Sequence, residues 1–585
     1  MKHFQLFLLL CIVQYSAVEV LANNIKVTNV STTGQVIVAP NNPNNYTNIV
    51  FDLTWDNSWR NIVNWDAAWI FVKYQINSDP LKRWYHARLS PNGDGYTVLL
   101  ENQIEPEFSP VSDSVGVFLF RKNQGAGNIN WSQVKLRWYY RSNGVNGVMG
   151  TGAQVSDNVD VTIKVFAIEM CYVPTGGFFV GSGGTKDFRS LTDGMWKASN
   201  NTGPTIKYYI GSEGTIPLGT SDTPGFLRSI DGLLDNLAPF VPAAYPKGYQ
   251  SFFCQKYEIT QGEFRDFLNT ISFSQQQSTG TVVLGRTIYP HFTTTVGAYL
   301  GGGNGNNPVF FPENRQGLKC IANPGAGMPC IFACDLNNNG IYDETTYSSS
   351  TGDGIDIPCK LTYYDGISYA DWSGLRPMSE LEFEKACRGN IAPFPDECAW
   401  GTSGYCGASS TFTIYSFNSG TGGTPYEAMF NDCASTASYG NAAWGQQGGI
   451  GSIGTYINGP VRVGAFAKST TNRVESGASY YGIMELSGNM TERCVILSTL
   501  NGLQFDGQYH GDGWLLNSGL TDIVNWQHLG QLNPMHWAMM MRGGNWFENG
   551  GTFRPGIQAS FRSGLGNSFW PRYNYFGFRC VRTAN

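Results

Sequence analysis

Short hydrophobic runs separated by polar turns dominate the chain between residues 23 and 165. Some runs alternate apolar and polar positions, others stay apolar, and turns rich in Asn, Gly, Pro and Asp lie between them. Such runs are typical of strands, and their number and spacing predict a β-sandwich domain over residues 23–165. The strands are expected at residues 49–55, 69–74, 96–100, 115–120, 134–139 and 159–165.

Helix signals occur further along the chain. Thr260 and Glu263 have capping-box spacing ahead of Phe264, which predicts a helix over residues 260–269. Ser379 and Glu382 repeat this spacing. Both signals are structural, and no chemistry is assigned to their carboxylates. No linker separates the last expected strand from the segment that begins at Met170, so we expect the two parts of the chain to pack together.

The first 22 residues have the pattern of a secretory signal peptide. Lys2 precedes an apolar run over residues 4–13, and a site of small residues ends at Ala22. Leu10 stands where a lipoprotein signal needs a small residue before Cys11, so no lipid anchor is expected. No later stretch has about twenty uncharged apolar residues, so no transmembrane segment is expected. The sequence predicts a secreted or cell-surface protein.

The amino-acid composition limits which classes of molecule the protein can bind. Of 585 residues, 42% are hydrophobic and 14% are charged, with a net charge of −6 and 71 glycines. The hydrophobic content excludes a largely disordered chain, and the lack of a basic stripe argues against nucleic-acid binding. A polar and aromatic surface suits a glycan or cell-surface protein as partner. Tryptophans of the first domain either fill its core or stack on sugar rings: Trp55, Trp59, Trp65, Trp69, Trp84, Trp131 and Trp138.

Cysteines are numerous and even in number once the signal peptide is removed. Thirteen are present, and Cys11 lies in the expected signal peptide. An exported protein with an even count favours disulfides. The quartet Cys320, Cys330, Cys334 and Cys359 could alternatively bind a metal, although no histidine lies nearby.

An Asn-rich segment has the spacing of a calcium loop. Oxygen side chains stand at positions one, three, five and nine, and Gly340 stands at position six, where a turn is needed. Position twelve is Thr346 instead of a bidentate Glu, so a plain Asn-rich turn is the alternative. The loop predicts calcium ligands at Asp335, Asn337, Asn339, Ile341 and Asp343.

Four further motifs occur in a fixed order. By itself, the ending from Met541 to Cys580 suits a buried terminal hairpin. Together, the motifs resemble those of the formylglycine-generating enzyme (sulfatase-modifying factor) family over residues 169–582. The resemblance implies an α+β fold of the C-type-lectin-like kind with little regular secondary structure, interrupted by an insertion at about 273–361. The motifs are residues 170–182 with 257–264, residues 375–389, residues 481–492, and residues 541–546 with 574–580.

The resemblance also implies a structural calcium ion in the third motif. Carried over residue by residue, Glu485 and Glu492 would supply carboxylates, and Gly488 and Met490 would supply carbonyl oxygens. Hard oxygen donors suit calcium better than a transition metal. The alternative is that Glu492 only caps a turn. Family members further pair the cysteines that correspond here to Cys387 and Cys580, which implies a disulfide between them.

The catalytic residues of the family are missing. The resemblance implies a copper(I) site of two thiolates a few residues after the Gly-Gly-x-Trp motif, but no cysteine lies between Cys494 and Cys580. Copper is therefore not expected. The five histidines after the signal peptide form no spaced pair for a mononuclear iron site, and no serine has a convincing nucleophile-elbow pattern.

Two functions of different class remain open. The first is a secreted, non-catalytic binding or cell-surface structural protein on the sulfatase-modifying factor scaffold. The second is an enzyme of the cysteine-oxidising superfamily with a replaced active site. Its candidate cleft residues are Glu548, Arg554, Arg562 and Trp570.

Overall fold

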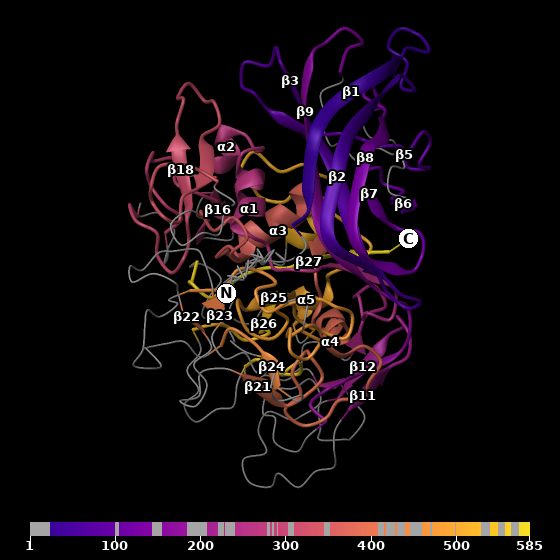
Figure 1. Ribbon diagram of the computed structural model, residues 1–585, viewed down its shortest axis with the longest axis vertical. Coiled ribbons are helices and arrows are strands. Elements are labelled where there is room, and N and C mark those ends of the chain that lie inside the picture. Colours follow the sequence, from indigo (N-terminus) through magenta and orange to yellow (C-terminus); the bar gives the residue numbers. More distant parts are fainter. Residues whose placement is uncertain are drawn as a thin grey trace, which may run out of the picture.

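A computed structural model gives the arrangement of most of the chain (Figure 1). The expected signal peptide at 1–22 lies outside the described residues. These are 24–99, 104–142, 155–183, 207–219, 227–228, 240–277, 281–283, 286–288, 291–301, 309–343, 352–406, 415–416, 428–429, 439–444, 459–467, 471–497, 499–527, 539–547, 556–562 and 572–584.

One large sheet runs through both parts of the molecule. Its strand order is β20-β27-β15-β9-β3-β7-β6, and β4 pairs with β3. Strand β9 pairs with β3 from Asp66↔Cys171 to Ile76↔Val161, and it also pairs with β15. The expected boundary at residues 165–169 therefore falls inside one strand. The bounds are β3 Asp66–Ile76, β4 Trp84–His86, β6 Pro106–Pro110, β7 Val117–Arg121, β9 Val161–Val173, β15 Phe252–Gln255, β20 Arg376–Pro377 and β27 Cys580–Thr583.

A second sheet lies in the N-terminal part, with strand order β1-β2-β8-β5. Its hydrophobic side chains share a buried cluster with Ala68, Ile70 and Val72 of β3. Trp69 and Phe71 point to the opposite face of β3, where they join the largest core of the molecule. Because successive side chains of a strand alternate between faces, β3 contributes to both cores. The bounds are β1 Lys26–Val36, β2 Tyr46–Arg60, β5 Thr97–Leu99 and β8 Gly125–Trp138.

Each of the six predicted hydrophobic runs coincides with a strand of these two sheets. The runs at 49–55, 69–74, 96–100, 115–120, 134–139 and 159–165 overlap β2, β3, β5, β7, β8 and β9. Figure 1 shows these strands together in indigo and purple. Strands β1, β4 and β6 were not predicted, because their sequences carry no comparable hydrophobic run.

Few helices accompany the strands, so the described chain is α+β. The predicted helix at 260–269 is α1, and Thr260 and Glu263 form the capping box expected of them. Ser379 and Glu382 likewise cap α4. Two further capping boxes were missed: Ser272 with Gln275 starts α2, and Thr362 with Asp365 starts α3. The bounds are α1 Gln261–Leu268, α2 Phe273–Gln276, α3 Tyr363–Trp372, α4 Glu380–Arg388, α5 Leu500–Leu503 and α6 Val524–Gln527.

Short two-stranded sheets and one three-stranded sheet complete the described fold. They are β10 Phe178–Val180 with β11 Tyr208–Ile210, β12 Ile216–Gly219 with β13 Leu227–Arg228 and β14 Phe240–Val241, β16 Thr281–Val283 with β17 Arg286–Ile288, β18 Leu318–Ala322 with β19 Ile331–Cys334, β21 Gly404–Cys406 with β24 Tyr439–Asn441, β22 Tyr415–Ser416 with β23 Ala428–Met429, and β25 Glu492–Val495 with β26 Met539–Arg542.

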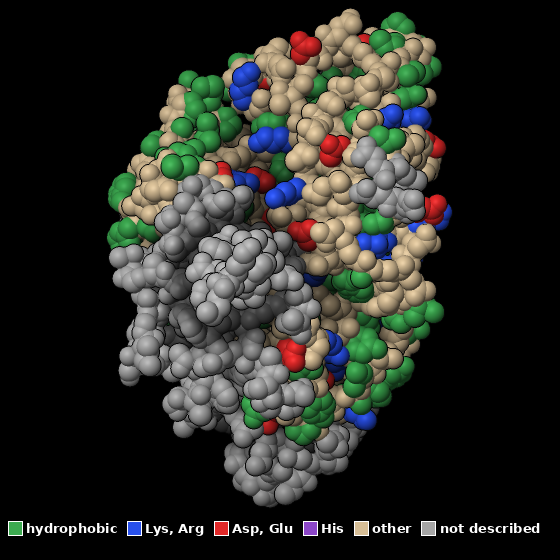
Figure 2. Space-filling view, in the orientation of Figure 1, with side chains coloured by type: hydrophobic (Ala, Val, Ile, Leu, Met, Phe, Trp, Pro, Cys, Tyr) green, Lys and Arg blue, Asp and Glu red, His purple; other side chains and the backbone are tan. Residues whose placement is uncertain are grey.

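The helices and the charged surface were compared with what a membrane or a nucleic acid would require. Within the described residues, no helix has the length and apolarity needed to cross a membrane. On the face shown in Figure 2, Lys and Arg side chains are scattered over the described surface and form no continuous patch.

Candidate functional site

The motifs at 481–492, 541–546 and 574–580 meet at one place. Strand β25 pairs with β26 through Glu492↔Arg542. The Trp546 amide donates to the Asn489 carbonyl at 2.9 Å, and the Gly577 amide donates to the Thr491 carbonyl at 2.9 Å. Three segments that are distant in sequence are therefore fixed to one another by main-chain hydrogen bonds.

Two glycines allow this close packing. Gly543 and Gly544 have φ angles of +85° and +67°, in the region that disfavours residues with a Cβ. A Cβ at Gly543 would lie 2.7 Å from a carboxylate oxygen of Glu492. The Gly-Gly pair of the motif thus brings the backbone against a buried acid.

Three acidic side chains are buried beside these glycines. Arg579 donates from Nε to Oε1 of Glu492 at 2.8 Å. Glu258 accepts from the Met490 amide and the Asn489 side chain, both at 2.8 Å. Glu485 accepts from the Gly464 amide at 2.8 Å. We call Glu258, Glu485 and Glu492 the carboxylate cluster.

Burial changes the acidity of this cluster. Loss of hydration raises the pKa of Glu485 to about 7, although Arg579 opposes that shift. Burial also raises the pKa of Glu492, against the effect of Arg579. The pKa of Glu258 is well above its ordinary value because of burial and the neighbouring Glu492. Arg579 can balance the charge of one of the three carboxylates. The cluster is therefore more stable when a carboxylate is protonated or when a cation is bound.

Two of these oxygens suit a metal ion. The Oε2 atoms of Glu485 and Glu492 are buried and have no hydrogen-bond partner among the described residues. An unpaired buried carboxylate oxygen is costly, and a hard cation such as calcium would satisfy it. The structure therefore brings Glu485 and Glu492 into one buried cluster, and a calcium ion held by Glu485, Gly488, Met490 and Glu492 stays a prediction. Glu258 was missed, because residues 257–264 were interpreted as part of a family motif in which only Thr260 and Glu263 received a role, as a helix cap.

The second predicted calcium loop is held by protein contacts. Lys319 Nζ lies 2.7 Å from Oδ2 of Asp335, and Arg265 lies 2.8 Å from Oδ1 of Asp343. The Asn337 and Asn339 side chains accept from the amides of residues 339 and 341, at 2.9 and 2.7 Å. A calcium ion at Asp335, Asn337, Asn339, Ile341 and Asp343 would have to compete with two cationic side chains.

Arg562 is the one predicted cleft residue that the structure describes. It is buried, and its Nε and Nη2 atoms donate to the two oxygens of Glu380 at 2.7 and 2.8 Å. Its assignment to an open cleft is corrected, because the guanidinium belongs to an internal ion-pair network with Glu380. Glu548, Arg554 and Trp570 lie outside the described residues.

That network extends through the centre of the domain. Arg542 contacts Glu380 at 3.2 Å and Glu384 at 2.8 Å. Arg388 contacts Glu384 at 2.7 Å and Glu397 at 2.9 Å. All these side chains are buried. The charges therefore neutralise one another inside the fold.

The implied disulfide partners are not brought together. Cys580 lies in the core that contains Phe178 and Trp372, whereas Cys387 lies in a separate cluster with Cys494. Both are free thiols in the structure. The reason is the alternation of β27: Cys580 faces one core, and the adjacent Val581 faces the cluster that holds Cys387.

The cysteine quartet lies in one core: Cys320, Cys330, Cys334 and Cys359 are all buried there, and the Cys320 thiol donates to the Ala322 carbonyl at 3.7 Å. Among the described residues, the group close enough to hold a metal ion is a set of aspartates instead of these cysteines: Asp371, Asp512 and Asp522.

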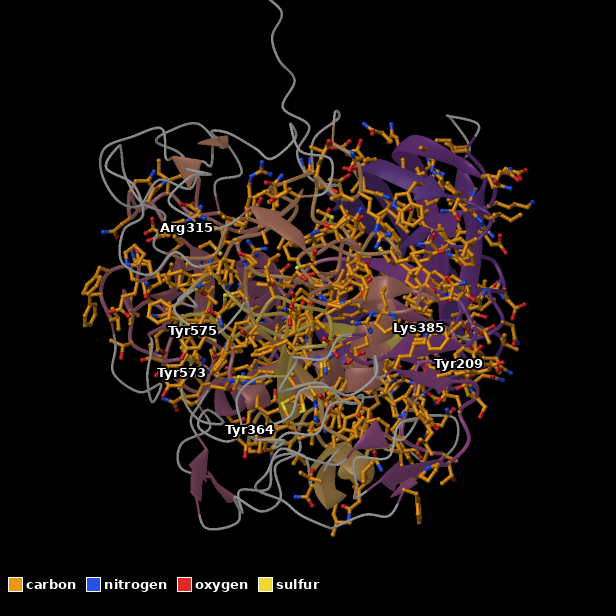
Figure 3. All side chains as sticks on the ribbon, turned by 90° about the horizontal axis from the view of Figure 1, so that it is seen from below. Tyr209, Arg315, Tyr364, Lys385, Tyr573 and Tyr575 are labelled. Atoms are coloured by element: carbon orange, nitrogen blue, oxygen red, sulfur yellow. The ribbon has the colours of Figure 1, made fainter. Side chains whose placement is uncertain are left out.

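A row of aromatic rings lies directly after the Gly-Gly-Asn-Trp motif. Phe547 stacks on Tyr575 at 5.4 Å between ring centroids and 6° between planes. Tyr575 stacks on Tyr573 at 5.5 Å and 1°. Tyr573 is 36% exposed, and Figure 3 shows Tyr573 and Tyr575 side by side, far from Tyr209. We call Phe547, Tyr575 and Tyr573 the aromatic row.

Comparison with known families identifies the scaffold of the C-terminal part. The model of the sulfatase-modifying factor enzyme 1-like domain matches residues 241–584, more than half of the chain. The match contains the motifs at 257–264, 375–389, 481–492 and the C-terminal end, and the segment at 170–182 precedes it. No curated protein matches the chain.

Proposed function

Because the chain belongs to the sulfatase-modifying factor family, we propose that it uses this scaffold as an exported, non-catalytic binding or cell-surface structural protein. The finer assignments belong to the same proposal: a β-sandwich over residues 23–165 and a C-type-lectin-like fold over 169–582. Its partner is a glycan or a cell-surface protein.

The aromatic row carries this proposal. In the resembled enzymes two thiolates follow the Gly-Gly-x-Trp motif, whereas here Phe547 follows Trp546 and stacks on Tyr575. Tyr573 extends the row to the surface. Partly exposed tyrosines combine a large contact area with a hydroxyl group and lose little conformational entropy on binding, which favours recognition.

The buried ion pairs also support a non-catalytic binding function. Arg542, Arg562 and Arg579 are each paired with a buried carboxylate. Removing any one of these partners would leave a buried charge, so the groups stabilise the fold. A catalytic role would need groups that can reach a substrate.

The alternative is an enzyme with a replaced active site. One observation favours it: burial raises the pKa of Glu485 to about 7, a value suited to proton transfer near neutral pH. Glu485 is buried, however, and its Oε1 accepts from the Gly464 amide. Calcium binding accounts for this carboxylate without any reaction.

The test is a binding screen of the purified mature protein against a glycan array and against cell-surface protein extracts. Tyr573→Ala should weaken the binding that the parent shows by about 2 kcal/mol, or roughly 30-fold. Tyr209→Ala is the matched control, because Tyr209 is 55% exposed and lies on the other side of the molecule in Figure 3. Equal loss in both variants, or no binding by the parent, would count against the proposal.

A second assay addresses the alternative. The protein would be incubated with a cysteine-containing sulfatase peptide and copper, and oxygen consumption and formylglycine would be measured. No turnover is expected. Formylglycine in the peptide would establish the enzymatic alternative.

A further inference from the structure

A pocket of about 380 Å³ opens where the N-terminal strands meet the family domain. Strands β3 and β4 form one side, the α1–α2 connection forms the second, and the loop at 511–522 forms the third. We call it the junction pocket. Its lining includes Lys73, Arg83, Trp84, Gln275, Trp514 and Asn517. Its size lies within the range of small-ligand sites, which often occur between domains.

Aromatic rings form a continuous support for this pocket. Tyr74 stacks on Tyr85 at 5.5 Å, and Tyr85 lies parallel to Trp514 at 6.3 Å and 13°. Trp514 comes from the family domain and the two tyrosines from the N-terminal sheet. Trp84 and Trp514 are only partly buried. Both indoles can therefore offer contact area to a ligand in the pocket.

The loop that carries Trp514 is fixed before any ligand binds. Asp371 of α3 accepts from the Asp512 amide at 3.1 Å and from the Thr521 hydroxyl at 2.6 Å. Gln275 donates to the Leu515 carbonyl at 3.0 Å. These contacts hold the loop from both sides. A preformed site does not lose affinity to loop ordering.

The pocket also carries polar groups but little unbalanced charge. Lys73 is buried and donates to the Gly513 carbonyl at 2.9 Å. Arg83 pairs with Asp79 at 2.9 Å. Lys164 lies 4.9 Å above the Trp84 ring, so a cationic ligand would meet a cation already placed there. Arg83 is already paired, and burial lowers the pKa of Lys73 although the nearby Asp371 and Asp512 oppose that shift, so a neutral ligand is favoured over an anion.

We propose that the junction pocket binds a neutral saccharide of one to three rings. A pyranose ring has apolar C–H faces, which suit Trp84 and Trp514, and hydroxyl groups at its edge, which suit the exposed Asn517 and the Lys73 ammonium. The Gln275 amide is already bonded to Ser272, Leu515 and Leu516, so it shapes the wall without contacting the ligand through a free donor. A purely apolar ligand would cover the exposed Asn517 amide without replacing its contacts with water, at a cost in binding free energy. Aromatic faces combined with a few placed polar groups define the specificity of such a site.

This site is distinct from the aromatic row, and it extends the proposed binding function to a stated ligand class. The row lies beside the Gly-Gly-Asn-Trp motif, whereas the junction pocket joins β3, β4 and the 511–522 loop. Either binding site can be disproved while the other stands, because the two sites share no residue.

The experiment is a titration of the mature protein with maltotriose, cellotriose and N,N′-diacetylchitobiose, followed by tryptophan fluorescence and calorimetry. At least one saccharide should bind the parent. Trp514→Ala and Trp84→Ala should each weaken that binding at least tenfold. Tyr509→Ala is the control, because Tyr509 is 52% exposed and does not line the pocket. Tyr573→Ala should leave this binding unchanged.

Two results would overturn the inference. One is that none of the three saccharides binds the parent. The other is that both tryptophan variants, shown to be folded by their thermal midpoints, bind as the parent does. If Trp514→Ala does not fold, the partly exposed Trp84 decides the outcome. Loss of binding in Tyr573→Ala with both tryptophan variants unaffected would place the saccharide at the aromatic row and refute the junction site.

Discussion

Arg562 and Glu380 form a two-pronged ion pair in the interior of the family domain, with Nε and Nη2 at 2.7 and 2.8 Å from the two carboxylate oxygens. Glu380 begins α4, and Arg562 lies more than 180 residues later. Arg562 balances the buried charge of Glu380, whose pKa is lowered by Arg562 and Arg542 against the effect of burial.

Arg562→Ala should destabilise the protein. Removing the guanidinium leaves Glu380 with the longer contacts to Arg542 and to the Leu497 amide, both at 3.2 Å, so we expect the free energy of unfolding to fall by about 3 kcal/mol. Urea denaturation measures the change. Lys122→Ala is the control, since its pair with Glu105 is exposed on both sides and should contribute less than about 1 kcal/mol. Equal stability of the two variants would show that Arg562 is not paired in the interior.

Calcium should raise the thermal midpoint of the protein and chelation should lower it. An ion that binds only the folded state stabilises it by about 2.7 kcal/mol at 100 times its Kd. Glu485→Gln and Glu492→Gln should each reduce the calcium-dependent shift, because their unpaired Oε2 atoms are the expected ligands. Scanning calorimetry with and without chelator provides the measurement.

The two predicted calcium sites can be separated. Asp343→Asn leaves the carboxylate cluster intact and changes only the loop where Arg265 already contacts Asp343. If this variant keeps the full calcium response, the cluster holds the ion. A midpoint that does not respond to calcium in the parent would remove both sites.

Glu263 should make stability depend on pH. Burial raises the pKa of Glu263 from 4.5 to about 7, although the Thr260 amide and hydroxyl oppose this shift. The folded state therefore keeps a proton that the unfolded state loses above about pH 4.5. The contribution to stability is fully present below pH 4.5 and is lost as the pH rises through about 7.

Glu263→Gln should remove this dependence and be more stable than the parent at pH 8. Glutamine preserves the capping box, because its side chain can also accept from the Thr260 amide. Denaturation midpoints at pH 4, 6 and 8 test the expectation, with Glu105→Gln as an exposed control. Parallel curves for the parent and Glu263→Gln would contradict it.

Peptide mapping of the exported protein under non-reducing conditions should find Cys320 linked to Cys330. Both thiols lie in the same core, Cys320 on β18 and Cys330 directly before its partner strand β19, and an oxidising compartment favours their pairing. Cys580 should be recovered without Cys387, since the two lie in different clusters. A peptide joining Cys387 to Cys580 would show that the cores beside β27 are arranged differently.

The sequence by itself determined the features that depend on neighbouring residues. Alternation placed β2 and β3, and the capping-box spacing placed α1 and α4, because strand faces and helix ends are defined over a few residues. The ordered motifs identified the family, which the match over residues 241–584 confirmed. They also selected Glu485 and Glu492, which the fold places in one buried cluster.

Only the tertiary structure decided the features that depend on distant partners. The sequence assigned Arg562 to a cleft, yet Glu380 holds it in the core. It assigned β9 to the end of one domain, yet β9 continues through the sheet to β15. These contacts join residues between 79 and 182 positions apart, and a local pattern contains no record of them. The role of Arg562 and the strand pairing of β9 were therefore fixed by long-range packing.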